Sequence, residues 1–257
     1  GMQFDRDGNL LVCIGGMGLY KVTPKQEVVK LTDETNRSFL SVVDDSRLRL
    51  ADDLDIAPDG RVYFSEATVR YEQEEWATDA LESRGNGRII VYDPRTDTTR
   101  TEIHRRVFPN GVCMANDGQS FFFAESWIAA IQRYYFDGPK KGTIETVVAN
   151  LPGYPDNINR ASDGNYWVAL LGMRTPALDL ALSMPGFRRR MARRVAPDLW
   201  LYPNINTGCV VKFDEQGNIL DALWDLGGVS NNRIGRYKLP DADPNWCAED
   251  FYWGAKT

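Results

Sequence analysis

Apolar and polar positions recur in the same order at four places along the chain. In each copy an apolar residue stands five positions ahead of the aspartate of an Asp-Gly pair, and a short apolar run follows the pair. The pairs are Asp7-Gly8, Asp59-Gly60, Asp117-Gly118 and Asp163-Gly164, and the aligned apolar residues are Met2, Leu54, Val112 and Ile158. Asp-Gly between short apolar runs is a strong hairpin signal, so each copy predicts two antiparallel strands joined by a tight turn.

Each copy is followed by a further apolar segment, which extends the repeat to a larger unit. These segments occupy residues 18–24, 87–94, 131–138 and 208–217, and their alternation predicts another strand. Successive Asp-Gly pairs lie 52, 58 and 46 residues apart. Multistranded units that repeat at about 40–50 residues are typical of a β-propeller. The alternative is a β-sandwich with similar hairpins, but a sandwich offers no reason for polar residues to recur in register.

Polar residues stand just ahead of the aligned apolar position in three of the copies. They are Asp52 and Asp53, Asn110, and Asp156 and Asn157. If the repeats are arranged radially, these side chains meet near one axis. The alternative is a structural role, in which they hydrogen-bond to backbone groups and fix the loops.

Two insertions interrupt the repeat pattern. In residues 69–87, good helix formers at 72–83 predict a short acidic helix that ends by Gly85. Residues 175–204 predict two short helices broken at Pro185-Gly186, of which the second, at 187–194, is basic and amphipathic. We expect the arginines to face solvent and Leu180, Leu182 and Phe187 to pack inward. This insertion is either a solvated cap on the propeller rim, a lid over the central channel, or a point of peripheral membrane contact.

Composition favours one large all-β domain over residues 1–257. Of these residues 43% are hydrophobic, and the net charge of −6 argues against nucleic-acid binding. There is no run of 18 apolar residues and no visible N-terminal signal peptide, so we expect a soluble chain in the cytoplasm or periplasm. The oligomeric state does not follow from the sequence.

The cysteines and the single histidine limit which kinds of metal or catalytic site the sequence supports. Cys13, Cys113, Cys209 and Cys247 form no CxxC or Cys-His pattern, which argues against structural zinc, and a disulfide framework is not expected in a domain of this size. His104 is the one histidine, and it falls on a predicted outer strand. Without a Gly-x-Ser-x-Gly motif, a Ser-His-Asp hydrolase has little support.

Several of these segments resemble the strictosidine synthase-like family, which includes adipocyte plasma membrane-associated proteins. The resemblance rests on ADDLDIAPDGRVYFSEAT at 51–68, FPNGV at 108–112, LPGYPDNINRASDGNYWVAL at 151–170, and a helical insertion with PGF and several arginines. It covers most of residues 1–226. The wider superfamily contains regucalcin-like gluconolactonases and paraoxonases, and all are six-bladed propellers, so the resemblance implies six blades.

Four full repeats and a remnant are visible in this chain. The remnant is RIGRYKL at 233–239, which lacks the Asp-Gly strand that should precede it. Either segments of a six-bladed propeller are missing near residue 1 and near 228–229, or the propeller is shortened. We favour missing segments, because an open propeller leaves unpaired strand edges. The catalytic glutamate of the family's synthases belongs to a late blade and is not assigned here.

The resemblance also implies a cation site. In metal-dependent relatives the residues ahead of the inner strands hold a divalent cation, and the matching positions are Asp52, Asn110, Asp156 and Asn157. Their oxygens suit Ca²⁺, with Mg²⁺ as the alternative. Such an ion would polarise an ester or lactone carbonyl, while Asp53 or Asp156 activates water as the catalytic carboxylate.

Three functions therefore compete. The first is a metal-assisted hydrolase of lactones or aryl esters acting on a small-molecule substrate. The second is a metal-free strictosidine synthase-type enzyme that condenses an amine with an aldehyde. The third is a non-catalytic small-molecule-binding scaffold, because a fold does not by itself fix a function.

Overall fold

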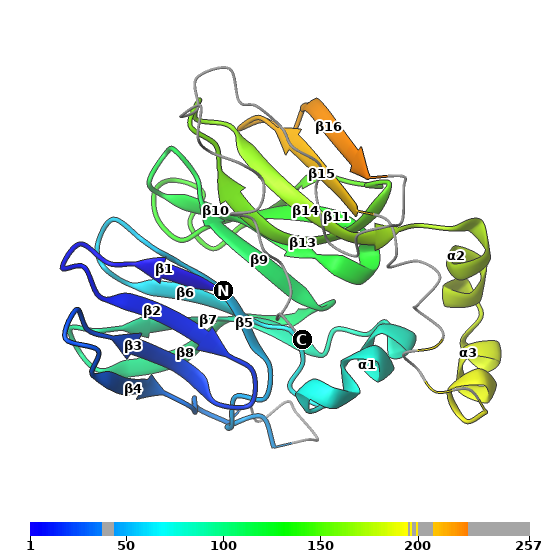
Figure 1. The fold of residues 1–257 in the computed structure, drawn as a ribbon, viewed down its shortest axis with the longest axis horizontal. Helices are drawn as coiled ribbons and strands as arrows, with labels where there is room; N and C mark the ends of the chain where they lie inside the picture. Colours follow the sequence, from blue (N-terminus) through cyan, green and yellow to red (C-terminus); the bar gives the residue numbers. More distant parts are fainter. Residues whose placement is uncertain (38–43, 195, 197–198, 200–207, 226–257) are drawn as a thin grey trace.

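Four antiparallel sheets of four strands each make up the computed structural model, which describes residues 1–37, 44–194, 196, 199 and 208–225 (Figure 1). Each sheet is built from consecutive strands that pair in sequence order. The first sheet contains β1 (Met2–Phe4), β2 (Leu10–Ile14), β3 (Gly18–Val22) and β4 (Val28–Thr32). The second contains β5 (Ala51–Ile56), β6 (Val62–Glu66), β7 (Gly87–Asp93) and β8 (Thr98–Arg106).

The third and fourth sheets repeat this plan. The third contains β9 (Pro109–Met114), β10 (Ser120–Glu125), β11 (Ala130–Tyr135) and β12 (Ile144–Val148). The fourth contains β13 (Gly153–Arg160), β14 (Tyr166–Met173), β15 (Gly208–Phe213) and β16 (Ile219–Asp225). The first strand of each sheet contacts the first strand of the next, from β1 to β5 to β9 to β13. The sheets are therefore the blades of a β-propeller, and the predicted all-β propeller fold is confirmed.

The described residues form four blades. The count of six, which the family resemblance implies, stays a prediction. The segment around residues 228–229 and the expected closing strand at 233–239 both lie outside the described residues.

The Asp-Gly turns form as the sequence predicts. Gly8, Gly60, Gly118 and Gly164 all adopt positive φ, between 64° and 89°, which is the left-handed region that glycine enters without a steric penalty. The Asp117 carboxylate accepts the backbone N–H of Gln119 at 2.9 Å. Asp59 and Asp163 accept the equivalent N–H two residues later, each at 3.1 Å. In these three turns the aspartate and the glycine thus stabilise the turn in complementary ways, whereas in the first turn Asp5, and not Asp7, accepts the N–H of Asn9 at 2.8 Å.

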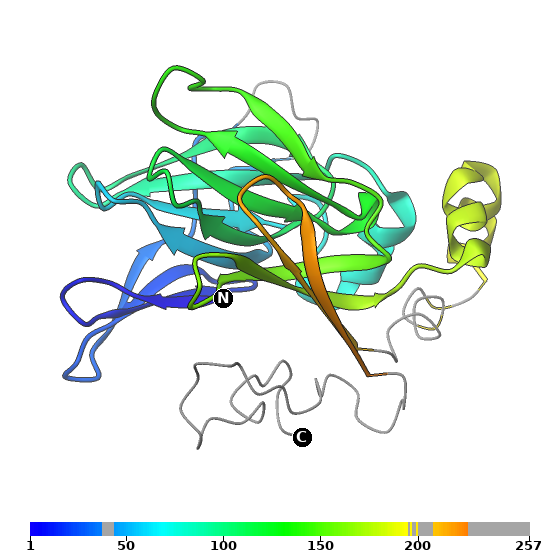
Figure 2. The same ribbon diagram turned by 90° about the horizontal axis from the view of Figure 1, so that it is seen from above.

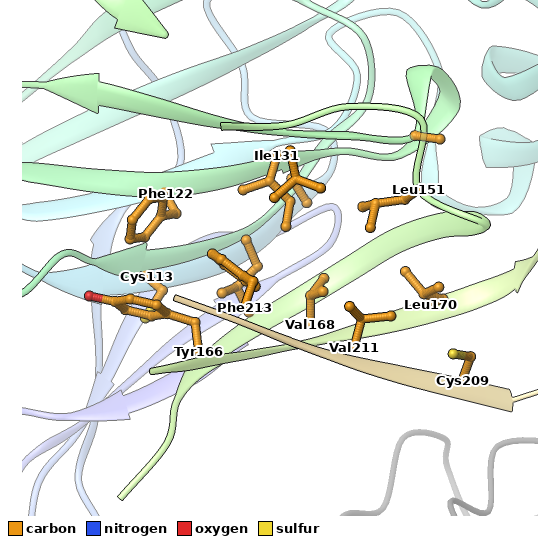
Figure 3. Close-up of a cluster of buried hydrophobic side chains, with 14 of the residues drawn as sticks. Cys113, Phe122, Ile131, Leu151, Tyr166, Val168, Leu170, Cys209, Val211 and Phe213 are labelled. Atoms are coloured by element: carbon orange, nitrogen blue, oxygen red, sulfur yellow. The ribbon is translucent and has the colours of Figure 1, made fainter. Parts of the chain in front are cut away.

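The hydrophobic core lies between the blades. Phe122 of β10 makes edge contacts with Tyr166 of β14 and Phe213 of β15, with ring centroids 4.7 and 5.5 Å apart (Figure 3). Equivalent clusters join the first blade to the second and the second to the third. Cys13, Cys113 and Cys209 are buried free thiols in these clusters, as small core residues would be. Cys247 lies outside the described residues.

Both insertions contain the predicted helices. The first forms η1 (Gln73–Glu75) and α1 (Trp76–Glu82), and the second forms α2 (Pro176–Ser183) and α3 (Pro185–Ala192). Helix α1 ends at Glu82, within the predicted range of 72–83, but its C-cap is Ser83 at φ 47° and not the predicted Gly85. The break between α2 and α3 falls at Met184, and Pro185 begins α3, as its fixed φ favours at the start of a helix.

Helices α1 and α2 pack beside the end of the propeller at which the inner strands begin. Leu178 of α2 and Ala77 of α1 share one buried cluster with Leu50, Phe108 and Tyr154, which lie close to the first residues of β5, β9 and β13. One sequence expectation for this insertion is wrong: Leu180, expected to pack inward, is 62% exposed. Among the described residues, no helix has the length and apolar character needed to span a membrane.

Candidate functional site

Three inner strands carry an irregularity at the same level. In β5 the two residues Asp52 and Asp53 stand opposite a single residue of β6, so the strand bulges between Ala51 and Leu54. In β13 the pair Asp156 and Asn157 bulges in the same way against β14.

The third irregularity lies in β9, where Asn110 and Gly111 stand opposite one residue of β10. A bulge interrupts the alternation of side chains and re-aims them. Every polar residue predicted from the sequence to form the site therefore lies in a bulge, in three successive blades.

The strands approach one another closely at these bulges. A Cβ atom on Gly111 would lie 2.3 Å from the backbone nitrogen of Ile158 and 2.5 Å from the carbonyl oxygen of Asp156. Only glycine therefore lets β9 meet β13 at this distance. The Asn110 side chain hydrogen-bonds to the Asp156 carboxylate across the same contact. Gly111 is not among the site residues predicted from the sequence, although its place directly after Asn110 is a usable signal.

Asp53 is held between blades. Its Oδ2 accepts the backbone N–H of Val112 at 3.0 Å, and its own N–H donates to Ser65 Oγ at 3.1 Å. Asp55, two residues further along β5, accepts the N–H of Met114 at 2.7 Å. Both aspartates thus accept backbone N–H groups of the next blade. Hydrogen bonding to the backbone, the structural role that the sequence offers as the alternative to a binding site, is therefore present at Asp53 and Asp55.

Burial raises the pKa values of the three site carboxyl groups, and repulsion by neighbouring carboxylates raises those of Asp53 and Asp156 further. Desolvation raises the pKa of Asp53 and of Asp156 to about 7, and that of Asp52 to about 6. The charges of Asp52 and Asp53 raise the pKa of Asp156 further, which shows that the three groups lie within electrostatic reach of one another. The Asn110 hydrogen bond acts in the opposite direction on the pKa of Asp156.

The donor set fits a hard cation. Asn110 is buried, and its Oδ1 atom has no hydrogen-bond partner, which is costly for an amide oxygen away from water. Carboxylate and amide oxygens are the ligands that Ca²⁺ and Mg²⁺ prefer. In the part of the chain that the structure describes, no three His, Cys, Asp or Glu side chains form a metal-binding group by themselves. An ion here would therefore need the amide oxygens as well as the carboxylates.

The residues predicted as ligands differ in how closely the structure connects them to one another. Asn110 and Asp156 are linked by a hydrogen bond, and Asp52 and Asp53 lie within electrostatic reach of Asp156. Asn157 occupies the same bulge as Asp156 and is buried, with its backbone against Gly111. His104 is exposed on β8, the outer strand of its blade.

Two glutamates that end second strands hold the loops leading into the site. Glu66 Oε1 accepts the N–H of Arg49 at 2.6 Å, just ahead of β5, and Glu125 Oε1 accepts the N–H of Val107 at 2.7 Å, just ahead of β9. Glu66 also forms a fully buried ion pair with Arg88, with Nε 2.6 Å from Oε2. These contacts position the inner strands and do not depend on a ligand.

Comparison with known proteins confirms the resemblance. Residues 52–139 match the family model described as strictosidine synthase. The chain is 30% identical over 253 residues to protein strictosidine synthase-like 13 of Arabidopsis thaliana, covering 93% of this chain and 61% of that protein. It is 30% identical over 234 residues to the adipocyte plasma membrane-associated protein of Danio rerio, covering 89% of this chain and 55% of that protein.

Solved structures share the fold at low identity. A gluconolactonase from Xanthomonas campestris matches with a TM-score of 0.56 and 13% identity, over 86% of this chain and 60% of that one. Regucalcin, a calcium-binding protein from Agrobacterium tumefaciens, matches with a TM-score of 0.52 and 14% identity, over 86% and 58%. The chain thus spans about three-fifths of the proteins that it matches.

Proposed function

We propose that this chain, which is similar to strictosidine synthase-like proteins over most of its length, is a hydrolase that cleaves lactones or aryl esters with the help of a divalent cation. The observation that carries the proposal is the buried, unpartnered Oδ1 of Asn110 beside three carboxyl groups with raised pKa values. A cation would supply the missing partner of the amide and offset the repulsion among the carboxylates.

The residues that would hold the ion are Asp52, Asn110, Asp156 and Asn157. Ca²⁺ takes six to eight oxygen ligands, so water and substrate oxygens would complete the shell, and Mg²⁺ is the alternative. When bound, such an ion polarises the substrate carbonyl and stabilises negative charge on its oxygen. A cation that is bound to these carboxylates would also bring their pKa values down, since it favours the ionised form.

Asp53 is the better placed of the two candidate bases, because it is outside the ligand set. The Val112 N–H fixes one of its oxygens, and a pKa of about 7 leaves a comparable amount of ionised and protonated carboxyl at neutral pH. Ionised Asp53 would take a proton from water as the water oxygen attacks the carbonyl carbon. The proton would then pass to the leaving oxygen as the ester or lactone C–O bond breaks. Asp156 would take this part if it is not a ligand.

The names of the structural neighbours agree with this chemistry. One neighbour is a gluconolactonase and another is described as calcium-binding. At 13% and 14% identity they share the fold with this chain, so the proposal rests on the chain's own residues.

The test is Asp156→Asn, with Asp7→Asn as the matched control. Asp7 is an exposed aspartate in the first Asp-Gly turn, so the control makes the same chemical change away from the site. We expect Asp156→Asn to weaken Ca²⁺ affinity in a titration and to lower hydrolysis of an aryl ester and a γ-lactone by about 10²-fold or more. Asn110→Ala should act in the same direction with a smaller effect, because a neutral ligand is lost.

Two results would contradict the mechanism. Unchanged hydrolysis in Asp156→Asn would exclude its proposed role. No hydrolysis by the wild-type protein in the presence of Ca²⁺ would exclude the hydrolase itself and favour a binding scaffold.

The raised pKa values also favour a second candidate. Carboxyl groups that titrate near neutrality can act as acid and base without a cation, as a synthase-type condensation of an amine with an aldehyde requires. Condensation of an aryl ethylamine with an aldehyde by protein dialysed against EDTA, together with no ester turnover, would select this alternative.

A further inference from the structure

The α2–α3 insertion presents two kinds of side chain to the outside. In both ribbon views it lies at the periphery of the molecule, outside the four sheets (Figures 1 and 2). Arg189, Arg190, Arg193 and Arg194 are all exposed, at spacings that place them on one side of α3 and its C-terminal turn. Leu180 and Met184, on α2 and at the break, are 62% and 43% exposed.

Side chains on the inward side of the insertion already have partners in the rest of the protein. Arg188 donates two hydrogen bonds to the carbonyl oxygens of Leu81 and Glu82, at the C-terminal end of α1. Leu178 and Ala181 are buried, and Leu178 packs in the cluster beneath the helix. One arginine thus attaches α3 to the propeller, and the other four are not used for that purpose.

The arginines on the outward side have no acidic partners within the described part of the chain. No ion pair or hydrogen bond to a carboxylate there involves Arg189, Arg190, Arg193 or Arg194. Four like charges at i, i+1, i+4 and i+5 repel one another, which disfavours the helix unless an anionic partner approaches. The chain as a whole carries a net charge of −6, so this basic face is a local reversal of the average charge.

We propose that this face, defined by Leu180, Met184, Arg189, Arg190, Arg193 and Arg194, docks on an anionic lipid surface. The arginines match the negative headgroups of such a leaflet. Leu180 and Met184, which are exposed on the same insertion, are the reason for choosing a bilayer over a purely polyanionic partner, because they can enter the headgroup and acyl boundary. The contact is peripheral, and it is independent of the proposed hydrolysis.

The proposal is tested by co-sedimentation of the protein with vesicles of phosphatidylcholine, with and without phosphatidylserine. We expect binding to the phosphatidylserine vesicles, weakened by added salt. Replacing Arg189 and Arg193 by Gln should weaken this binding by about 30-fold, and Leu180→Ser by about tenfold. The matched control replaces Lys25 and Lys141, exposed lysines on hairpins of other blades, by Gln. It changes the net charge equally and should bind as the wild type does.

Three outcomes would overturn the proposal: no binding to phosphatidylserine vesicles, equal loss in the lysine control, or binding to a DNA duplex in place of the vesicles. If Leu180→Ser binds the vesicles as the wild type does while the arginine variant loses binding, the contact is electrostatic only. That result would overturn the proposed insertion of apolar residues into the bilayer. Hydrolysis of a water-soluble ester should be the same in all these variants, so failure of the docking proposal is distinguishable from failure of the enzymatic one.

Discussion

The buried carboxyl group of Asp53 gives a measurable pH dependence of stability when divalent cations are absent. In the folded protein its pKa is about 7, raised chiefly by desolvation from an ordinary value of 3.8. Between these two values the folded state binds more protons than the unfolded state, so the free energy of unfolding falls as pH rises. The stabilisation is fully present below the ordinary pKa and is lost as pH rises through 7.

The size of the effect follows from the two pKa values. For one group that titrates near 7 when folded and near 4 when unfolded, raising the pH from 5 to 8 removes about 2.5 kcal/mol of stability. Asp52 and Asp156 have raised pKa values too and act in the same direction. The wild-type loss therefore exceeds the contribution of Asp53, and a variant is needed to isolate it.

Asp53→Asn removes the titrating group and keeps its shape. The amide oxygen can still accept the Val112 N–H, so the strand contact should survive. In EDTA we expect the variant to lose less stability than the wild type between pH 5 and pH 8, by about 2.5 kcal/mol. For a chain of this length that corresponds to roughly 5–10 °C in Tm.

Thermal unfolding at pH 5, 6.5 and 8 provides the assay, with Asp7→Asn as the control for loss of one exposed carboxylate. Added Ca²⁺ should raise the wild-type Tm more at pH 8 than at pH 5, because protons compete with the ion for the carboxylates. A wild-type stability that stays constant or rises over this range in EDTA would contradict a raised pKa of Asp53 in the folded state. So would an Asp53→Asn variant with the same pH dependence as the wild type.

Three further predictions concern stability and are checked by urea unfolding. Gly111→Ala should lower the free energy of unfolding by about 3 kcal/mol, because the added Cβ would clash with the backbone of β13. Gly186→Ala, where the added Cβ meets open space, should leave the free energy of unfolding unchanged or raise it. Equal effects of the two substitutions would argue against the close approach of β9 and β13. Glu66→Ala should lower the free energy of unfolding by about 3 kcal/mol, because it removes the closer of the two buried carboxylates that pair with Arg88 and leaves only Asp45, 3.7 Å away. Asp33→Ala, in the exposed pair with Lys30, should lower it by less than about 1 kcal/mol. Leu178→Ala should lower the free energy of unfolding by about 2–5 kcal/mol because Leu178 is buried, and Leu180→Ala by about 0.5 kcal/mol or less because Leu180 is exposed. The reverse order would mean that α2 packs through its other face.

Local signals in the sequence were sufficient for the architecture. The Asp-Gly turns depend on glycine φ and on an aspartate that bonds two residues along the chain, so they can be identified without any long-range contact. The repeat then predicts blades, and the composition of 72–83 and 175–200 predicts helices. Helix ends were less accurate, because Ser83 reached the left-handed conformation without being a glycine.

Sequence alone also identified the polar pairs, because they recur at the same position relative to the Asp-Gly turns. It could not show that Asp52-Asp53, Asn110-Gly111 and Asp156-Asn157 each form a bulge, since a bulge is defined by the partner strand. The raised pKa values likewise depend on burial and on charges brought from other blades.

The sides of the insertion helices were decided only by packing. Leu178 and Leu180 look equivalent in the sequence, yet the first is buried against α1 and the inner-strand ends and the second faces outward. Arg188 looks like its arginine neighbours, yet it alone bonds to the end of α1. Periodicity and turn residues are properties of neighbouring positions and are legible in one chain. Which face is covered, and which carboxylates meet, depend on segments more than a hundred residues apart in the sequence, such as Asp52 and Asp156, and only the tertiary structure brings these together.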